Sequence, residues 1–190
     1  METSGELVYS NGLQLQGWAI DDLGVMSSQL TGITLPINST IAPRVTGNVN
    51  FAGNLHPSAD PVATPTILSR NIEVVDSLGR TNLVEIRFTQ TADNTWSWQA
   101  YEDDGTTTIG APGTLNFDTG GHPTGPTGGI VNLPAAGGAA AMAINLDFSN
   151  ITQYDAKDSS VAYAQDGYEM GYLDSFKIDS AGKIIGVFTN

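Results

Sequence analysis

Period-two alternation of apolar and polar residues is the pattern that most constrains the fold of this chain. It is clearest in residues 84–88 and 96–100, which flank a short stretch of turn-forming residues, Ala92-Asp93-Asn94. The apolar positions are Val84, Ile86, Phe88, Trp96, Trp98 and Ala100. Because successive side chains of a strand point to opposite faces, this pattern predicts a β-hairpin with one face on a core and the other in water.

Other segments repeat the strand signal, and almost nothing repeats a helical one. Residues 173–178 and 184–188, joined by the turn residues 179–182, predict a second hairpin. Shorter strands are predicted over residues 12–18, 47–51, 72–75, 113–117 and 143–148. Ala135–Met142 is interrupted by Gly137-Gly138, and each glycine costs a helix about 1 kcal/mol, so we interpret it as a loop that enters a strand. The predicted fold class is all-β.

The composition suits short strands joined by many turns. The chain has 190 residues, of which 22 are glycine and 14% are charged, against roughly 25% charged in a typical soluble domain. Two regions are predicted to be connections. Thr34–Pro43 contains two prolines and little alternation, and Gly105–Gly129 is rich in Gly, Thr and Pro, although the strand at 113–117 interrupts it.

The charge and the missing cysteine exclude several classes of function. Twenty acidic and 7 basic residues give a formal charge of −13, which disfavours nucleic acid and anionic membrane surfaces, because both bind through Lys and Arg. Without cysteine there is no disulfide, thiolate metal site or cysteine nucleophile. The sequence also has no apolar run of the roughly 20 residues that span a bilayer, and residues 1–4 show no signal peptide.

The polar residues that a metal or acid–base site would use lack the necessary spacing. His56 and His122 each stand in a turn beside a proline with no second histidine nearby, so both are predicted to be surface turn residues. The acidic clusters Glu102-Asp103-Asp104-Gly105 and Asp21-Asp22 are not spaced as in a calcium loop. We interpret them as solvated turns.

Trp96 and Trp98 have two readings. On one strand face they could stack on a sugar, but they also match the apolar face of Val84, Ile86 and Phe88, which favours a place in a β core. The acidic residues show no pair at a spacing diagnostic of glycoside hydrolysis. The residues themselves therefore predict no catalytic residue, no cofactor site and no metal ligand.

Three groups of segments together resemble the bacterial flagellar hook protein family. The C-terminal group is Gln165–Tyr168, Gly171–Leu173, Phe176–Asp179, Gly182–Gly186 and Thr189-Asn190. The N-terminal segment is Leu7–Trp18, with Trp18 where the family usually has tyrosine, and the middle group is Val75–Gly79, Val84–Phe88 and Asn94–Trp96. Each motif is short, but their order and spacing cover nearly the whole chain.

The resemblance implies two β domains, with the outer one inserted into a discontinuous inner one. Residues 1–44 and 149–190 would form the inner domain, and residues 45–148 the outer domain. Within the motifs, Gly12, Gly79, Gly167 and Gly182 fall where turns are expected to need a positive φ. The helical termini with which the family packs the axial core of its tube have no counterpart in this sequence, so we expect a core fragment that is monomeric alone.

The resemblance also implies a structural and mechanical function. The chain would be a subunit of the flagellar hook, the flexible joint that transmits motor torque to the filament, located in the extracellular flagellum. Export would use the flagellar secretion apparatus without a cleaved signal peptide. The implied partners are copies of itself together with hook cap, rod and hook–filament junction proteins. Since hook subunits slide past one another, polar and weakly adhesive surfaces are expected.

Three alternatives stay open at this point. A distal-rod relative of the same family shares the inner domain, although the insert of about 100 residues favours the hook. A carbohydrate-binding β-sandwich module would use Trp96, Trp98 and a calcium-ligating acidic cluster. The third is a hydrolase with two carboxylates that are distant in the sequence.

Overall fold

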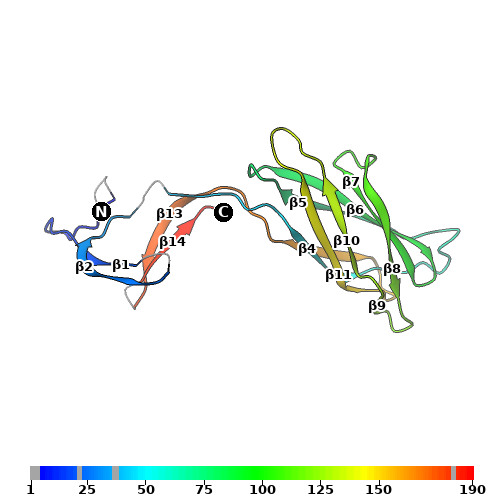
Figure 1. Cartoon of the computed structure of the whole chain (residues 1–190). Coiled ribbons are helices and arrows are strands. Elements are labelled where there is room, and N and C mark those ends of the chain that lie inside the picture. The colour runs from blue at the N-terminus through cyan, green and yellow to red at the C-terminus, as the bar shows by residue number, and fades with distance from the viewer. Residues whose placement is uncertain (1–4, 21–22, 36–38, 181–182) are drawn as a thin grey trace. The chain divides into compact units, whose positions relative to one another are not determined.

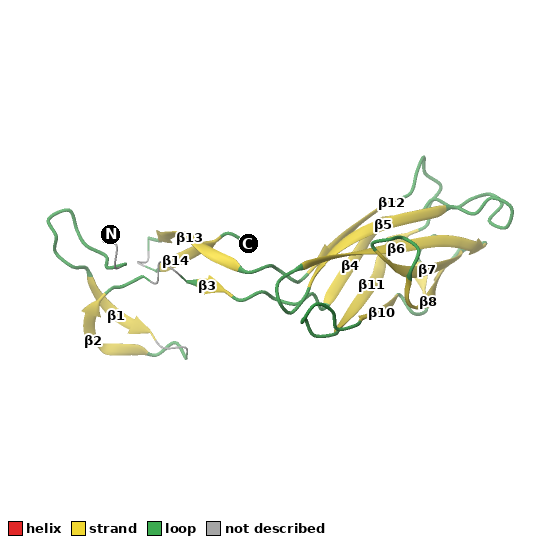
Figure 2. Ribbon diagram, turned by 90° about the horizontal axis from the view of Figure 1, so that it is seen from above, coloured by secondary structure: helices red, strands yellow, loops and turns green. Residues whose placement is uncertain are grey.

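Every regular element in the described part of the chain is a β-strand. The computed structural model describes residues 5–20, 23–35, 39–180 and 183–190 (Figure 1), and strands joined by loops make up all of it (Figure 2). The all-β prediction is confirmed. In chain order the strands are β1 (Gln16–Ile20), β2 (Met26–Gly32), β3 (Thr40–Ile41), β4 (Asn48–Asn54), β5 (Ile67–Val75), β6 (Thr81–Ala92), β7 (Thr95–Glu102), β8 (Thr108–Phe117), β9 (Pro123–Thr124), β10 (Gly128–Leu133), β11 (Met142–Thr152), β12 (Ser160–Gln165), β13 (Gly171–Ile178) and β14 (Ile184–Phe188).

The chain divides into two compact units. Unit 1 consists of residues 1–41 and 171–190, and unit 2 of residues 42–170. Unit 1 contains the β1–β2 ribbon and a three-stranded sheet in the order β14-β13-β3. Unit 2 contains a four-stranded sheet, β10-β11-β4-β12, and a five-stranded sheet, β5-β6-β7-β8-β9.

Unit 2 is a sandwich whose two sheets share one apolar core. The predicted hairpin forms its centre: β6 and β7 pair antiparallel with Ile86 opposite Ala100 and Phe88 opposite Trp98. From the other sheet, Phe148 places its ring 5.3 Å from those of Phe88 and Trp98. Edge-on aromatic packing of this kind adds to the gain from burial. The alternation in the sequence therefore reports which face of each sheet meets the core.

Sheet pairing in unit 2 joins segments far apart in the sequence. β11 runs parallel to β4, with Asn145 opposite Asn48, and β12 pairs antiparallel to β4 from the other side, with Val161 opposite Gly53. Ile151 and Val161 are buried in the same core as Val49 and Phe51 of β4. The end of β11 and all of β12 are thus part of this sandwich.

Because of this pairing, one of the two boundaries between the units lies at a different place from the one expected. The first crossing between units lies at residues 41–42, close to the expected 44–45, but the second lies at residues 170–171 and not at 148–149. Residues 149–170, expected in the discontinuous inner domain, lie in unit 2 because the apolar side chains of β11 and β12 complete its core.

The predicted connections contain more strand than expected. Gly105–Gly129 contains all of β8 and β9 and the start of β10, while Thr34–Pro43 contains the two-residue β3. The C-terminal hairpin is confirmed as β13 and β14, and Ala135–Met142 is a loop that enters β11, as predicted. No strand was predicted for β2, β10 or β12.

Candidate assembly surfaces

The two tryptophans of the central hairpin are core residues. Trp96 is fully buried and Trp98 is 5% exposed, and the indole N–H of Trp96 donates to the side-chain oxygen of Gln153 at 2.7 Å. A buried ring offers no face to a sugar, so the interpretation of both residues as core is confirmed. The carbohydrate-binding alternative loses its aromatic platform.

The two histidines lie apart from each other in loop segments. The exposed ring of His122 stands edge-on to Tyr154, with ring centroids 6.2 Å apart. His56 is half-buried; its Nδ1 accepts the backbone N–H of Ala156 at 3.2 Å and lies 3.4 Å from a carboxylate oxygen of Asp155. These contacts join loops to each other, which supports the reading of both histidines as turn residues.

The acidic turn after β7 uses one carboxylate to hold its own backbone. Asp104 accepts the N–H groups of Thr106 and Thr107 and the hydroxyl of Thr107. The Thr107 hydrogen bonds, followed by the one from Thr106, hold the pKa of Asp104 well below its usual range. Across the described ranges, no three His, Cys, Asp or Glu side chains form a group that could hold a metal ion. Asp21 and Asp22 lie outside the described residues.

Unit 1 carries an exposed sheet face, here called the apolar ribbon face: Trp18, Ile20, Met26 and Leu30. In the β1–β2 ribbon Trp18 lies opposite Leu30 and Ile20 opposite Met26, with a register shift between the two pairs. The exposed fractions of the four side chains run from 53% to 64%. An isolated two-stranded ribbon is marginally stable in water, so this face is suited to packing against further protein.

The surface of unit 1 departs from the polar surface that was expected. Among its described residues, the buried hydrophobic side chains are Leu7 and Leu35, both 9% exposed. Large exposed apolar side chains outside the apolar ribbon face include Tyr9, Leu13, Leu15, Tyr172, Ile178 and Ile185. Exposed apolar side chains thus outnumber buried ones among the described residues of unit 1.

A hydrogen-bonded clasp, formed by residues 44–48 and 165–168, closes unit 2 where the chain enters and leaves it. Arg44 and Tyr168 exchange backbone hydrogen bonds. The hydroxyl of Thr46 donates to the side-chain oxygen of Gln165 and accepts the N–H of Val75, both at 2.9 Å. The Gln165–Tyr168 motif thus links the four-stranded sheet to the end of β5.

Asp166 is the charged centre of this clasp. One carboxylate oxygen accepts the backbone N–H groups of Gly47 and Asn48 at 2.8 and 2.9 Å, and the other accepts the Asn48 side-chain amide at 2.8 Å. A guanidinium nitrogen of Arg44 lies 3.5 Å from it. Burial acts to raise the pKa of Asp166, but the hydrogen bonds from Asn48 and Gly47 and the charge of Arg44 lower it to about 2.

The glycines of the motifs serve two different purposes. Gly12 and Gly79 have φ of 81° and 80°, as expected for turns. Gly167 does not have a positive φ; a β-carbon there would collide with the Thr46 hydroxyl and lie 2.9 Å from the Arg44 carbonyl oxygen. Close approach of two backbones, not turn geometry, requires this glycine. Gly182 lies outside the described residues.

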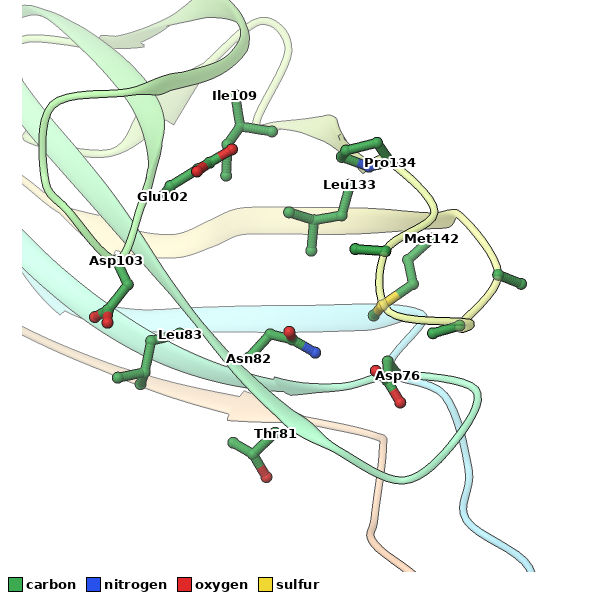
Figure 3. A pocket seen from close by; sticks show the side chains of 13 residues that line it. Asp76, Thr81, Asn82, Leu83, Glu102, Asp103, Ile109, Leu133, Pro134 and Met142 are labelled. Carbon is green, nitrogen blue, oxygen red and sulfur yellow. The ribbon is translucent and has the colours of Figure 1, made fainter.

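A pocket of about 460 Å³ opens at the end of unit 2 that carries the clasp (Figure 3). Its apolar walls include Leu83, Ile109, Leu133 and Met142, and the carboxylates of Glu102 and Asp103 stand beside them (Figure 3). The loop that follows β10 forms one rim. Together with the apolar ribbon face and the clasp, the pocket makes the set of surfaces from which a function can be argued.

Comparison with known proteins identifies the family. The family model described as the flagellar basal body protein FlaE D2 domain matches residues 39–168, which cover nearly all of unit 2. The chain belongs to this FlaE D2 domain family. The matched span includes the central hairpin, the clasp and the pocket.

Relatives of this FlaE D2 family chain extend the match into unit 1. The flagellar hook protein FlgE of Treponema pallidum is 30% identical, covering 100% of this chain and 53% of that protein. FlgE of Borreliella burgdorferi is 28% identical over 95% of this chain and 49% of that protein, and FlgE of Escherichia coli is 29% identical over 100% and 51%. The chain thus spans about half the length of these relatives.

A solved structure agrees at the level of fold. The crystal structure of Helicobacter pylori flagellar hook protein FlgE2 superposes with a TM-score of 0.61 at 12% identity, covering 99% of this chain and 76% of that chain. In the described part of the FlaE D2 family chain, no helix is long and apolar enough to cross a membrane.

Proposed function

We propose that this chain is the core of a structural subunit of the flagellar hook, the flexible joint that transmits motor torque to the filament. The observation that carries the proposal is the coincidence of two matches. The FlaE D2 family covers unit 2, and proteins named flagellar hook protein FlgE align with the whole chain, both units included. A distal-rod relative is not favoured, because the relatives matched across the whole chain are hook proteins.

The geometry supports a division of mechanical work between the two units. Unit 2 has a continuous aromatic core and a clasp where the chain enters and leaves it. These features resist deformation because packed interiors have low compressibility. Unit 1 buries few apolar side chains of its own, and its apolar ribbon face is exposed. In the proposed subunit, neighbouring copies cover this face, and unit 1 supplies the cohesive contacts of the tube. We propose that unit 1 and unit 2 correspond to the inner and the inserted outer domain.

The remaining features of the proposal follow from a place in the hook. Copies of the same subunit are the main partner, and rod, hook cap and hook–filament junction proteins would meet the two ends of the tube. The location is the extracellular flagellum, reached through the flagellar export apparatus without a cleaved signal peptide. The family is structural, which is consistent with a protein that catalyses no reaction.

A chimaeric hook subunit tests this function. The matching half of the Escherichia coli hook protein would be replaced by this chain in a strain that lacks its own hook gene. Hooks seen by electron microscopy and partial recovery of swimming are the expected results. The matched control carries the same replacement with Phe148→Asp, which places an unpaired charge in the core and abolishes hooks. Export of the chimaera without any hook would contradict the proposal.

A further inference from the structure

The two ends of unit 2 carry different surfaces. At the clasp end lies the pocket, between the start of β6 and the end of β10. At the opposite end lie the loops 55–66 and 153–159, because β5 begins at Ile67 opposite Thr89, and β11 ends at Thr152. The loops project beyond the sheets at that end (Figure 2). We call residues 60–65 together with Lys157 the knob.

The knob presents an apolar tip on a stiff turn. Val62 is 83% exposed, while Pro61 before it is buried. The turn is held by its own hydrogen bonds, from the Ala63 N–H to the Asp60 carboxylate and from the Thr64 N–H to the Asp60 carbonyl. An apolar side chain fixed in this way loses little entropy on binding, which suits it to act as an anchor.

The turn is anchored to the core of unit 2. The backbone N–H of Ser58 donates to the side-chain oxygen of Gln90 at 2.6 Å, and Gln90 is 2% exposed. The neighbouring loop is tied to the same region, since the Ala156 N–H donates to His56. This loop carries Lys157, which is exposed. The knob therefore combines an apolar tip with one cation, Lys157, which stands between Asp155 and Asp158 on a loop bonded to the same segment.

The pocket offers the matching chemistry. Among its lining residues Ile109 and Met142 are each 7% exposed, whereas Leu83 is 40% exposed. The ion pairs in the described ranges use the carboxylates of Asp76, Glu85, Asp155 and Asp166, and none uses Glu102 or Asp103. Arg80, the nearby cation, is bound to Asp76 at 2.9 Å. Two acidic side chains are thus left to face a cation from outside.

The rim of the pocket is preformed. The guanidinium of Arg80 donates to the carbonyl of Ala136 at 3.0 Å, and the hydroxyl of Ser77 accepts the N–H of Ala140 at 2.9 Å. These bonds hold the loop after β10 against the turn between β5 and β6. A volume of about 460 Å³ is in the range of pockets that take a small molecule, so it has room for an inserted side chain.

We propose that the knob of one copy inserts into the pocket of the next, with Val62 among the apolar walls and Lys157 beside Glu102 and Asp103. The occupant is a second copy of this chain. The inference deepens the proposed function by assigning a contact between hook subunits, and it rests on that function. Because knob and pocket are different surfaces at opposite ends of one unit, the contact is heterologous, and such contacts build an open helical polymer when the rotation between copies does not close a ring.

Engineered cysteines test the contact directly, because the native chain has none. The chain would carry Val62→Cys and Leu83→Cys together and be oxidised at high concentration. An internal disulfide is excluded by distance. Leu83 lies six residues along β6 from Thr89, which pairs with Ile67 at the knob end, and six residues of a strand span roughly 20 Å at about 3.3 Å per residue. A disulfide needs two Cα atoms within about 7 Å of each other. The expected product is a ladder of dimers, trimers and longer chains on a non-reducing gel.

Further variants show whether the ladder reports this contact. Each single cysteine variant should stop at dimers, and the pair Val62→Cys with Ile130→Cys should give no ladder, because Ile130 is 61% exposed but does not line the pocket. Adding Lys157→Glu should lower the ladder yield about twofold to fivefold, as for an exposed ion pair, and a further Asp103→Lys should restore it. Lys183→Glu, in unit 1, should leave the yield unchanged.

A Val62→Cys/Leu83→Cys ladder no stronger than that of the Ile130→Cys pair would overturn the proposal. Unchanged tryptophan emission would show in each case that the variant is folded. The inference and the proposed function fail separately: loss of the ladder with intact chimaeric hooks refutes this contact alone. A ladder together with a chimaera that builds no hook refutes the proposed function.

Discussion

The indole N–H of Trp96 donates to the side-chain oxygen of Gln153 at 2.7 Å and thereby ties the two sheets of unit 2 together. Trp96 belongs to β7 of the five-stranded sheet, and Gln153 follows β11 of the four-stranded sheet. The amide of Gln153 also donates to the side chain of Asn94 at 2.7 Å, in the turn of the central hairpin. Both Trp96 and Gln153 are buried, so water cannot replace either partner.

Replacing Gln153 with methionine should therefore destabilise unit 2. The substitution keeps the volume but leaves a buried indole N–H unpaired, which costs about 1–3 kcal/mol. Urea unfolding followed by tryptophan emission measures it, in a Trp18→Phe background where both remaining tryptophans lie in unit 2. Gln29→Met, on the exposed strand β2 of unit 1, is the matched control. An unchanged midpoint for Gln153→Met would show that the tie contributes nothing.

The central hairpin was predictable because its two strands are neighbours in the sequence. Alternation marks residues 84–88 and 96–100, and a short turn leaves them one way to pair. The parallel pairing of β11 with β4 gave no such sign, since Asn145 and Asn48 are brought together by the fold alone. β12 was missed for a related reason, because its apolar Val161 and Tyr163 form too short an alternation to stand out from a loop.

The candidate surfaces were less predictable than the core. A strand is predicted over residues 12–18, which include Trp18, but the sequence pattern is the same whether its apolar side chains are covered by this molecule or by another. The Gln165–Tyr168 motif was recognised by resemblance, while its partner Thr46 became visible only in three dimensions. The pocket has no local signature at all, because its walls come from five strands and three loops.

Gly167→Ala should weaken the clasp. The added methyl group would meet the Thr46 hydroxyl and the Arg44 carbonyl, and overpacking against backbone of this kind costs about 1–3 kcal/mol. Gly47→Ala is the control within the same clasp, since its β-carbon would meet nothing nearer than Asp166 at 3.8 Å. Thermal unfolding of the two variants compares them. Equal loss in both would mean that the close approach at Gly167 is not what requires glycine.

Acid should release the contribution of Asp166 to stability. The pKa of Asp166 is about 2 in the folded chain, against an ordinary aspartate value of 3.8, so the charged form is stabilised by folding. That contribution, roughly 1–2 kcal/mol, is complete above the unfolded pKa and disappears as the pH falls from about 4 to about 2. The free energy of unfolding of Asp166→Asn should therefore differ from that of the native chain at pH 6 and converge with it near pH 2. Parallel curves would contradict this.

Sugars and calcium should leave the emission of Trp96 and Trp98 unchanged. Both rings are buried, and the acidic turn after β7 uses the carboxylate of Asp104 to bind its own backbone. The Trp18→Phe background again restricts the signal to unit 2. A titration with a broad sugar panel, with and without calcium, should show no spectral shift. A saturable shift would revive the carbohydrate-binding alternative.

The apolar ribbon face should make the isolated chain bind hydrophobic dyes. Trp18 and Ile20 are 56% and 64% exposed on neighbouring positions of one face, and dye binding grows with contiguous apolar area. Trp18→Ser with Ile20→Ser should lower the dye fluorescence by roughly half, while unit 2 unfolds within about 0.5 kcal/mol of its native value because both side chains are at the surface. Ile130→Ser, which removes one exposed side chain from unit 2, should change the dye signal little. If both variants lowered the dye fluorescence equally, the dye would bind exposed apolar residues in general. The result would then give no support to the apolar ribbon face as the surface by which unit 1 joins an assembly.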